Sequence, residues 1–492
     1  MLRPASRRAN QQSGAPDGPQ PSPYGPDPAS YEYQQGPSPY GPPAPPYEPP
    51  TPPFGPAPFE PAGQTPYRQA PNGQAPYGPA PYEQAPYEQA PYEQAEDVPP
   101  GDGEDGSRRT RGRRRARGRG RVRRLLRRPT VRVILALIAV FCCWVAFSVG
   151  QAVTAPGGGS LSSKLAEWAR DHYLGPVVTF GEWLTYQPPK VGGKPSFSLA
   201  VPSGGAVKYK HVHGFRPIIP HRLSSLAGPP LAGEGQWRVL ETVKGQPAVF
   251  GTFLRPSSVY TSYVAGIVSL DQRLVSFQLR PGAEDPGPGG WKAKPWIPPG
   301  TRTGLIATFN GGFKINTSGG GFYLNGDTAG TLTNGAASVV YYRNGTIKIG
   351  TWGSEVRMTP NVVGVRQNLR LIVDHGRVPA SVNQDVLGSW GATLGGSYYV
   401  WRSGLGITKD GRAIFVYGPA LNVQELADLL QRAGAVEALQ LDINPYWMSF
   451  EYYKTDGHPS DPTPVNLLPT QQQTAYRYYS VYSRDFTAVY AR

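Results

Sequence analysis

Three short segments in the second half of the sequence carry residue types that could do chemistry. The first is a strand-like run that ends in Asn310-Gly311-Gly312-Phe313. Two successive glycines let a backbone approach a ligand closely and present N–H donors, a geometry that suits an oxyanion. The same four residues are also compatible with a tight turn after a strand, and the pattern alone leaves both interpretations open.

The second segment places Arg402 just before a glycine-rich strand, and the third reads Leu441-Asp442-Ile443-Asn444-Pro445-Tyr446-Trp447. An arginine at such a position either clamps a phosphate or lies on a solvated rim. We expect the Asp442 carboxylate where its strand leaves the sheet, a common place for functional side chains. Taken one at a time, each of the three segments leaves a purely structural interpretation open beside the chemical one.

Other widespread chemistries have no pattern in this sequence. It contains no Walker loop, no dinucleotide fingerprint, no His-Glu-x-x-His and no Gly-x-Ser-x-Gly. His211 and His213 would lie on one face of a strand, where a partly exposed pair is favoured over a metal site because acids are scarce nearby. Nothing in the sequence therefore requires a metal or another cofactor, although a metal is compatible with it.

Strands must position most of these residues. From Ala248 onward, runs rich in Val, Ile, Tyr and Phe alternate with turn signals such as Asn344-Gly345. One helix interrupts them, with Asn422 as its N-cap, Glu425 at the third position and Gly434 as its stop. A strand that ends at Asp442 follows at once. The sequence predicts an α+β fold, with a β-rich domain that holds a mixed or antiparallel sheet and a few helices.

In this order, the three segments resemble the phosphodiester glycosidase family. The matching residues are Asn310–Phe313, Arg402, Gly406-Ile407-Thr408-Lys409-Asp410-Gly411, Glu425-Leu426-Ala427, Gly434-Ala435 and Leu441-Asp442. The resemblance covers about Ala248–Tyr453, and its specificity lies in the ordered set rather than in any one motif. The chain departs from the family after Asp442, where Ile443-Asn444-Pro445-Tyr446 stands in place of Gly-Gly-Gly-Ser. Pro445, Tyr446 and Trp447 are expected to fill or reshape the space that glycines leave for substrate.

The resemblance implies hydrolysis of a sugar linked through its anomeric carbon to phosphate. Departure of a phosphomonoester needs less help from a general acid than departure of an alcohol. The site then requires donors for the phosphate and a carboxylate near the developing oxocarbenium ion. The implied catalytic residues are Asp442, Arg402 and Asn310, and the implied substrate-binding residues are Gly311, Gly312, Phe313, Asn444 and Trp447. A second carboxylate is left open among Asp327, Asp374, Asp385 and Glu451.

An apolar stretch at 133–150 precedes the domain and has the length of a transmembrane helix. Fourteen arginines and no acid lie between Arg108 and Arg132, which places the N-terminus in the cytoplasm by the positive-inside rule. A cleaved signal peptide is the alternative, but more than a hundred residues precede the stretch. We expect the arginines to contact anionic lipid rather than nucleic acid.

Composition divides the rest of the chain. Residues 1–107 are rich in Pro and Tyr, poor in Leu, Ile and Val, and predicted to be a disordered cytoplasmic tail. The Arg-rich segment spans 108–132, a flexible stalk spans 151–160, and residues 161–247 form a membrane-proximal helix and the start of the ectodomain. The phosphodiester-glycosidase-like domain spans 248–492. The two cysteines, Cys142 and Cys143, are adjacent within the apolar stretch, so no disulfide is expected in the outer domain.

These observations predict a single-pass membrane protein with a C-terminal extracytoplasmic domain that hydrolyses sugar-1-phosphodiester linkages in envelope glycans. From Gln151 onward the chain has 31 Lys and Arg against 21 Asp and Glu, a balance that suits a phosphorylated polysaccharide. The same basic, aromatic-rich composition fits a non-catalytic domain that binds wall glycan or polyanion. A third hypothesis makes the Pro/Tyr-rich tail the functional part, as a platform for cytoplasmic partners.

Overall fold

The computed structural model describes residues 129–155, 160–202, 215–383, 389–391 and 398–492. The tail predicted at 1–107 and most of the Arg-rich segment lie outside the described residues. The same holds for His211, His213 and Asp385.

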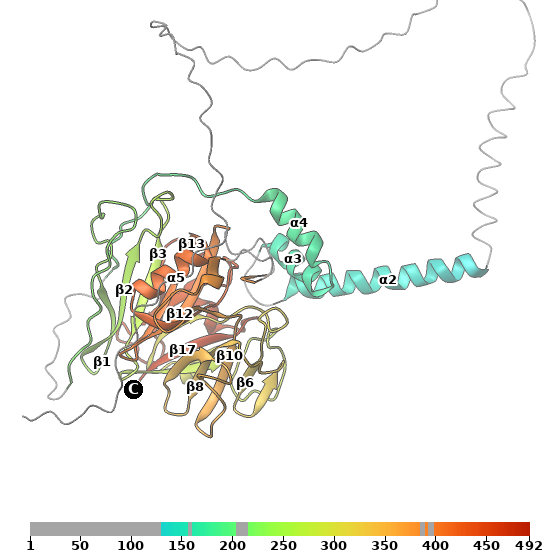
Figure 1. The fold of residues 1–492 in the computed structure, drawn as a ribbon. Helices are drawn as coiled ribbons and strands as arrows, with labels where there is room; N and C mark the ends of the chain where they lie inside the picture. The colour runs from blue at the N-terminus through green and yellow to red at the C-terminus, as the bar shows by residue number, and fades with distance from the viewer. Residues whose placement is uncertain (1–128, 156–159, 203–214, 384–388, 392–397) are drawn as a thin grey trace, which may run out of the picture. The chain divides into compact units, whose positions relative to one another are not determined.

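Three antiparallel sheets make up the domain (Figure 1). The seven-stranded sheet has the order β1 (Arg238–Val243), β2 (Gln246–Leu254), β3 (Ala265–Leu270), β13 (Ala413–Leu421), β12 (Val400–Thr408), β14 (Ala435–Gln440) and β11 (Leu371–Val373). One five-stranded sheet has the order β7 (Asp327–Ala329), β6 (Phe322–Leu324), β10 (Val362–Gln367), β8 (Ala337–Tyr342) and β9 (Ile347–Thr351). The other has the order β16 (Thr463–Asn466), β15 (Phe450–Lys454), β5 (Leu305–Asn310), β17 (Phe486–Ala491) and β4 (Val275–Arg280).

Four α-helices and three short 3₁₀ helices accompany the strands in the described part of the chain. The α-helices are α2 (Pro129–Thr154), α3 (Leu161–Asp171), α4 (Gly175–Thr185) and α5 (Val423–Arg432), and the 3₁₀ helices are η1 (Pro299–Thr301), η2 (Ala380–Asn383) and η3 (Ala475–Tyr479). The α+β class and the β-rich domain predicted from the sequence are confirmed.

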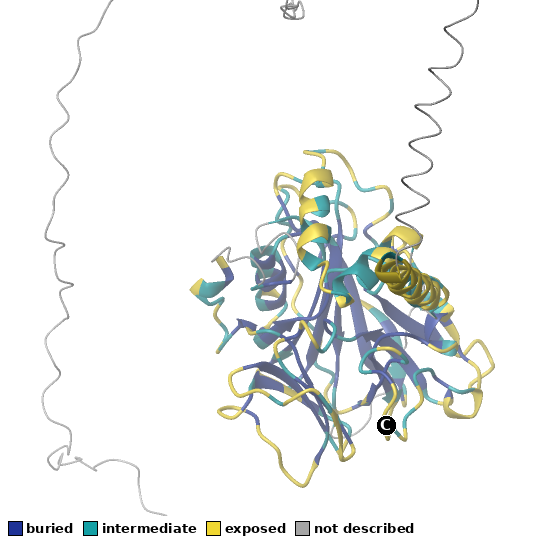
Figure 2. Cartoon of the chain, turned by 90° about the vertical axis from the view of Figure 1, so that its right-hand side faces the viewer, coloured by how far each residue is buried: buried dark blue, intermediate teal, exposed yellow. Residues whose placement is uncertain are grey.

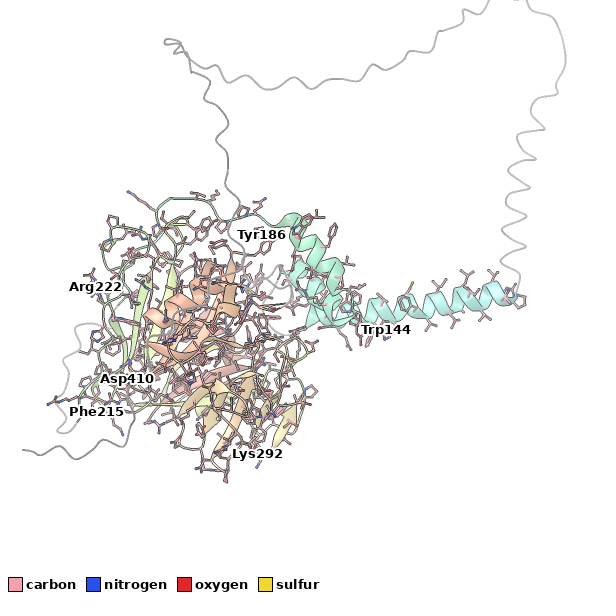
Figure 3. All side chains as sticks on the ribbon, viewed as in Figure 1. Trp144, Tyr186, Phe215, Arg222, Lys292 and Asp410 are labelled. Carbon is pink, nitrogen blue, oxygen red and sulfur yellow. The ribbon has the colours of Figure 1, made fainter. Side chains whose placement is uncertain are left out.

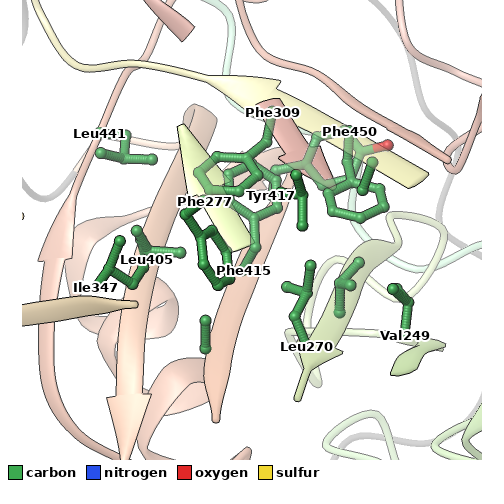
Figure 4. Close-up of a cluster of buried hydrophobic side chains, with 14 of the residues drawn as sticks. Val249, Leu270, Phe277, Phe309, Ile347, Leu405, Phe415, Tyr417, Leu441 and Phe450 are labelled. Atoms are coloured by element: carbon green, nitrogen blue, oxygen red, sulfur yellow. The ribbon is translucent and has the colours of Figure 1, made fainter. Parts of the chain in front are cut away.

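The period-two pattern of β13 divides the core between the two faces of the large sheet. Phe415 and Tyr417 point into a core that all three sheets share, where Phe415 lies 5.0 Å from Phe309 of β5 between ring centroids (Figure 4). Ile414 and Val416 point to the opposite face and pack with the buried leucines of α5. Because side chains alternate along a strand, one strand serves both layers.

The capped helix predicted from the sequence is confirmed as α5. The Asn422 side chain accepts a hydrogen bond from the Glu425 backbone N–H at 2.7 Å, and the Glu425 carboxylate reaches back to the Asn422 backbone. Gly434 ends the helix with φ at 98°, a conformation that favours glycine. The helix therefore ends just before β14, which begins at Ala435 and leads to Asp442.

Helix α2 is long and apolar enough to span a membrane, and no residue in it is buried (Figure 2). The labelled Trp144 lies near the end of α2 that leads to α3 (Figure 3), and its ring centroid is 5.8 Å from that of His172. The helix extends beyond the predicted stretch and continues to Thr154, so the stalk expected to be flexible from residue 151 is helical over its first four residues. The Lys164 Nζ donates to the carbonyls of Val153 and Ala155 at 2.9 and 2.8 Å, and this ties α3 to the end of α2.

Candidate active site

Ser403 joins three chain segments beneath the candidate site. Asn310 ends β5, Ser403 lies on β12, and Asp442 follows β14 by two residues. The Asn310 Nδ2 donates to Ser403 Oγ at 3.0 Å, and the Asp442 backbone N–H donates to the same oxygen at 3.2 Å. Backbone pairing of Ser403 with Leu441 and Asp442 extends the ladder past the end of β14. The three predicted segments therefore meet, although about 130 residues separate the first from the last.

Asp442 is 2% exposed, and its two carboxylate oxygens have different surroundings. Oδ1 accepts hydrogen bonds from the backbone N–H groups of Ile443 and Asn444 at 2.7 and 2.8 Å. Oδ2 lies 4.0 Å from Nη2 of Arg484. Burial disfavours the charged form and raises the pKa of Asp442 to about 6, although Arg484 and the two N–H donors oppose this. The carboxylate is ionised at neutral pH yet basic enough to accept a proton.

In the described part of the chain, Arg484 is the one Lys or Arg side chain within 4.0 Å of this carboxylate. Its guanidinium stacks on Trp447 with Cζ 4.0 Å from the ring centroid, and Nη2 donates to the Gly312 carbonyl at 3.1 Å. Asp285 lies 3.7 Å away. Within the described residues, Nε and Nη1 of this buried arginine have no hydrogen-bond partner. Buried donors are usually satisfied, so two unmatched N–H groups beside a carboxylate indicate a place for an oxygen-rich ligand.

Arg402, by contrast, is held by the protein. Its Nε donates to the Leu421 carbonyl at 2.9 Å, Nη1 to Gln440 Oε1 at 2.9 Å, and Nη2 to the Tyr398 carbonyl at 3.1 Å. Its side chain is 1% exposed and lines none of the five cavities described below. We infer that Arg402 supports the end of β12, and its contact with phosphate stays a prediction.

The two glycines after Asn310 are sites of close packing. A Cβ on Gly311 would come within 2.1 Å of Asp485 Oδ2, and a Cβ on Gly312 within 2.8 Å of Asn368 Oδ1. The Gly311 N–H donates to the Asp485 carbonyl at 3.0 Å, and the Phe313 N–H donates to Asn368 Oδ1 at 3.0 Å. These N–H groups already have acceptors within the protein, so the glycine requirement follows from packing.

A buried ion pair that no local motif marks holds this turn. Arg366 Nε lies 2.9 Å from Asp485 Oδ2, and Nη2 lies 3.1 Å from Oδ1, with both side chains almost fully buried. Arg366 also donates to the carbonyls of Phe313 and Gln367. The pair fixes the segment that carries Arg484 against the turn that follows β5.

Four of the eight predicted site residues line one cavity. Phe313, Asp442, Asn444 and Trp447 surround a volume of about 110 Å³. Glu167 of α3 and Lys314 are among the other residues that line the same cavity. Asn310, Gly311, Gly312 and Arg402 line none of the five cavities described and lie behind this surface. A neighbouring cavity of about 750 Å³ is lined in part by Arg484 and Lys314. Glu167 lines two more, of about 400 and 560 Å³, and a fifth cavity, of about 430 Å³, lies beside Asp410 and Arg412.

Helix α3 contacts the site directly. The Asn444 Nδ2 donates to Glu167 Oε1 at 3.2 Å, and Lys314 Nζ lies 2.8 Å from Asp171 Oδ2 and 3.7 Å from Glu167 Oε2. Burial raises the pKa of Glu167 to about 7 against the attraction of Lys314. No sequence pattern marks Glu167 as a site residue, because it lies some 275 residues before the segment it contacts.

The described candidates for a second carboxylate that the sequence analysis named lie outside the cavity lined by Asp442. Glu451 is fully buried, 3.3 Å from Arg477, and hydrogen-bonded to Thr308. Asp327 is exposed on β7, Asp374 is half-buried beside His375, and Asp385 lies outside the described residues. None of the three described residues lines a cavity that Asp442 lines.

One group of side chains in the described part of the chain has the composition of a cation site. Ligand atoms of Glu355, Asp374, His375 and Glu437 lie within 4.8 Å of one another. His375 is 76% exposed, its Nδ1 lies 2.5 Å from Asp374 Oδ1, and its backbone N–H donates to Glu437 at 3.0 Å. These internal pairings account for the group as a surface charge network, separate from the cavities around Asp442.

Stability is expected to fall as the pH rises from 5 to 8. Burial raises the pKa of Glu451 to about 7, of Glu167 to about 7 and of Asp442 to about 6, whereas in the unfolded chain such groups titrate near their ordinary values of about 4. The folded protein holds these protons more tightly. Their stabilising contribution is therefore complete below pH about 4 and is lost as the pH rises through 6 to 7.

Thermal unfolding followed by circular dichroism at a series of pH values measures this trend. Glu451→Gln keeps a neutral side chain of similar shape at every pH, so the variant should lose part of the decrease between pH 5 and 8. A midpoint that rises over this range in the unmodified protein would contradict the prediction.

Residues 303–442 match the phosphodiester glycosidase family. The match begins just before β5 and ends at Asp442, so it spans the turn after β5, Arg402 and the capped helix. No curated protein matches the sequence.

Several solved structures are similar to the chain. The catalytic domain of zebrafish N-acetylglucosamine-1-phosphodiester alpha-N-acetylglucosaminidase, auto-inhibited by its pro-peptide, is 15% identical with a TM-score of 0.36, covering 58% of this chain and 97% of that one. A hypothetical protein from Synechocystis is 12% identical with a TM-score of 0.30, covering 52% and 64%. A putative exported protein from Burkholderia pseudomallei is 13% identical with a TM-score of 0.25, covering 46% and 74%.

These identities and TM-scores are low, so the assignment depends on the sequence match and on the ordered segments within it. The match ends at the buried Asp442, and the turn after β5, Ser403 and Asp442 converge in space. The chain therefore contains a domain of the phosphodiester glycosidase family.

Proposed function

We propose that the protein is a membrane-anchored hydrolase that cleaves sugar-1-phosphodiester linkages in glycans of the cell envelope. The observation that carries the proposal is the pairing of Asp442 with Arg484. A buried carboxylate at the end of the matched segment lies 4.0 Å from an arginine that has two unmatched donors. Such a pair offers charge of both signs, one for a phosphate and one for an electron-poor anomeric carbon.

In the proposed reaction, Arg484 and Lys314 bind the phosphodiester. Both line the larger cavity of about 750 Å³, and charge-assisted contacts to phosphate oxygens are among the stronger hydrogen bonds in proteins. One face of Trp447 is covered by Arg484, and the ring also lines the smaller cavity with Asp442. A sugar placed there lies against an aromatic side chain and beside the carboxylate.

Asp442 acts on the anomeric carbon side. The bond between that carbon and the phosphate oxygen breaks, and its electron pair leaves with the phosphomonoester. A water oxygen forms the new bond to carbon, and Asp442 takes one water proton. The negative carboxylate also stabilises the positive charge that develops on the sugar ring in the transition state.

The variant segment after Asp442 forms an ordered turn. The Asn444 side-chain oxygen accepts from the Tyr446 N–H at 3.0 Å, and the Asn444 carbonyl accepts from the N–H groups of Trp447 and Met448 at 3.0 and 3.2 Å. This turn brings Trp447 under Arg484. We propose that it replaces the family's glycines with a preformed wall of the sugar subsite.

Membrane anchoring is part of the proposal. Helix α2 is long and apolar enough to cross a bilayer, and the arginines that precede it favour a cytoplasmic N-terminus. The domain would then act on envelope glycan, and the surplus of Lys and Arg after residue 150 suits a phosphorylated polymer.

The test is turnover by the full-length chain in lipid nanodiscs. An N-acetylhexosamine-1-phosphodiester and a phosphodiester-linked wall polymer are supplied, and released reducing sugar is measured over time. We expect release from at least one of them. Binding of the polymer without release of sugar would overturn the hydrolase and support a glycan-binding domain instead.

A further inference from the structure

Glu167 of α3 occupies a position that the proposed reaction does not yet use. We infer that Glu167 is the second carboxylate of the site and the proton donor to the departing phosphate oxygen. The inference rests on the proposed function and names a residue outside the segment that matches the family, which begins at residue 303.

The position of Glu167 is the first support. Its Oε1 accepts from Asn444 Nδ2 at 3.2 Å, two residues after Asp442, and both carboxylates line the cavity of about 110 Å³. Glu167 also lines adjacent cavities of about 400 and 560 Å³. The side chain therefore borders all three spaces around the Asn444–Trp447 turn, and no other carboxylate does so in the described part of the chain.

The helix that carries Glu167 is fixed at several points, which is what a proton donor needs. Ser160 caps α3 by accepting from the Ser163 N–H at 3.1 Å, and Glu167 and Asp171 then lie one turn apart on the face that meets Lys314. On the other side, Trp168 Nε1 donates to Ser148 Oγ of α2 at 2.9 Å. The donor is thus positioned by the segment that leaves the apolar helix.

The charges around Glu167 leave it protonated when Asp442 is ionised. Burial has the largest effect, Lys314 and Arg484 lower its pKa, and Asp442 and Asp171 raise it. The result is a pKa of about 7 for Glu167 against about 6 for Asp442. Two neighbouring carboxyls with different pKa values are what an acid and its partner require. The geometry assigns the roles: Asp442 lies beside Arg484 and is the charged member, and Glu167 accepts from Asn444 and is the proton-bearing member.

The step balances with these two residues. As the bond from the anomeric carbon to oxygen breaks, the Glu167 proton passes to that phosphate oxygen. The water that attacks the carbon gives one proton to Asp442. Glu167 ends ionised and Asp442 ends protonated, and exchange of one proton with solvent restores both.

The experiment compares Glu167→Gln with the unmodified full-length protein in nanodiscs. Gln keeps an oxygen for Asn444 but has no proton to give, so kcat on the sugar-1-phosphodiester should fall about 10²-fold, within the usual range for loss of an acid. The decline of kcat above pH about 7 should disappear with it. On a glycosyl fluoride, whose leaving group needs no proton, the rates of variant and unmodified protein should be close to equal.

The matched control is Glu241→Gln on β1. Burial raises the pKa of Glu241 to about 8, and it lines none of the five cavities described, so the same substitution there should leave kcat and its pH profile unchanged. Thermal unfolding of each variant separates loss of chemistry from loss of fold.

The two ways of failing are distinct. If the unmodified protein turns over and Glu167→Gln keeps both its rate and its alkaline decline, Glu167 is not the donor and the proposed function stands. If the unmodified protein releases no sugar from any phosphodiester, the proposed function fails first. An equal loss on phosphodiester and fluoride, with the pH profile unmoved, would assign Glu167 a structural role and overturn the inference.

Discussion

Asp442→Asn is expected to lower kcat on a sugar-1-phosphodiester by about 10³-fold, within the range for loss of a catalytic base. Asn preserves the shape and keeps an oxygen that can accept from the Ile443 and Asn444 N–H groups. It cannot carry the negative charge or take a proton from water. The initial rate of sugar release, normalised to folded protein, measures the effect.

The same variant should be at least as stable as the unmodified protein at pH 8. Burial penalises the ionised Asp442, so a neutral isostere removes a cost of folding rather than a stabilising charge. An inactive but stable variant is therefore the signature of a catalytic carboxylate. Asp428→Asn on α5 is the matched control, because Asp428 lines none of the five cavities described and should keep full activity. Asp442→Asn with unchanged turnover would remove Asp442 from the mechanism.

Arg484→Met is expected to lower kcat/KM by about 10²–10³-fold, the usual loss when one donor to a developing anion is removed. Met fills part of the volume over Trp447 but supplies neither charge nor N–H donors. Arg484→Lys should recover only part of the activity, because an ammonium lacks the planar fork that holds two phosphate oxygens. Inhibition by inorganic phosphate should weaken in parallel, since the same donors bind it.

A second buried arginine on an aromatic ring provides the control. Arg302 lies 3.5 Å above the Tyr479 ring and 2.5 Å from Asp461. Neither Arg302 nor Tyr479 lines the cavity that Asp442 lines. Arg302→Met should reduce stability without changing kcat/KM. If Arg484→Met and Arg302→Met alter only stability, Arg484 has no part in phosphate binding.

Local signals explain how much of the fold was predictable. The N-cap, the residue at the third position and the terminating glycine of α5 all lie within thirteen residues, so the helix and the strand leading to Asp442 could be predicted together. Alternation of apolar residues identified most strands from β2 onward. Strand boundaries are less visible in the sequence, because the whole Tyr260–Leu270 run is strand-like, whereas Tyr260 begins a turn and pairing begins only at Ala265.

The candidate site was predictable only where its residues belong to short motifs. Phe313, Asp442, Asn444 and Trp447 line one cavity, as the ordered segments indicated. Glu167 and Arg484 come from the two ends of the domain and reach the site through tertiary packing, which single-sequence patterns do not encode. Arg402 shows the converse, since its position on β12 was visible but its hydrogen-bond partners were not.

The continuous path from α2 through Lys164 to α3 has a consequence for how the protein would meet its substrate. The carbonyls of Val153 and Ala155 accept from Lys164, and only residues 155–160 lie between the two connected helices. If α2 is the anchor, the catalytic groups work in a thin layer at a set height above the bilayer. The rate should then follow the number of polymer ends per unit of membrane area, and soluble fragments in bulk should compete weakly against tethered chains.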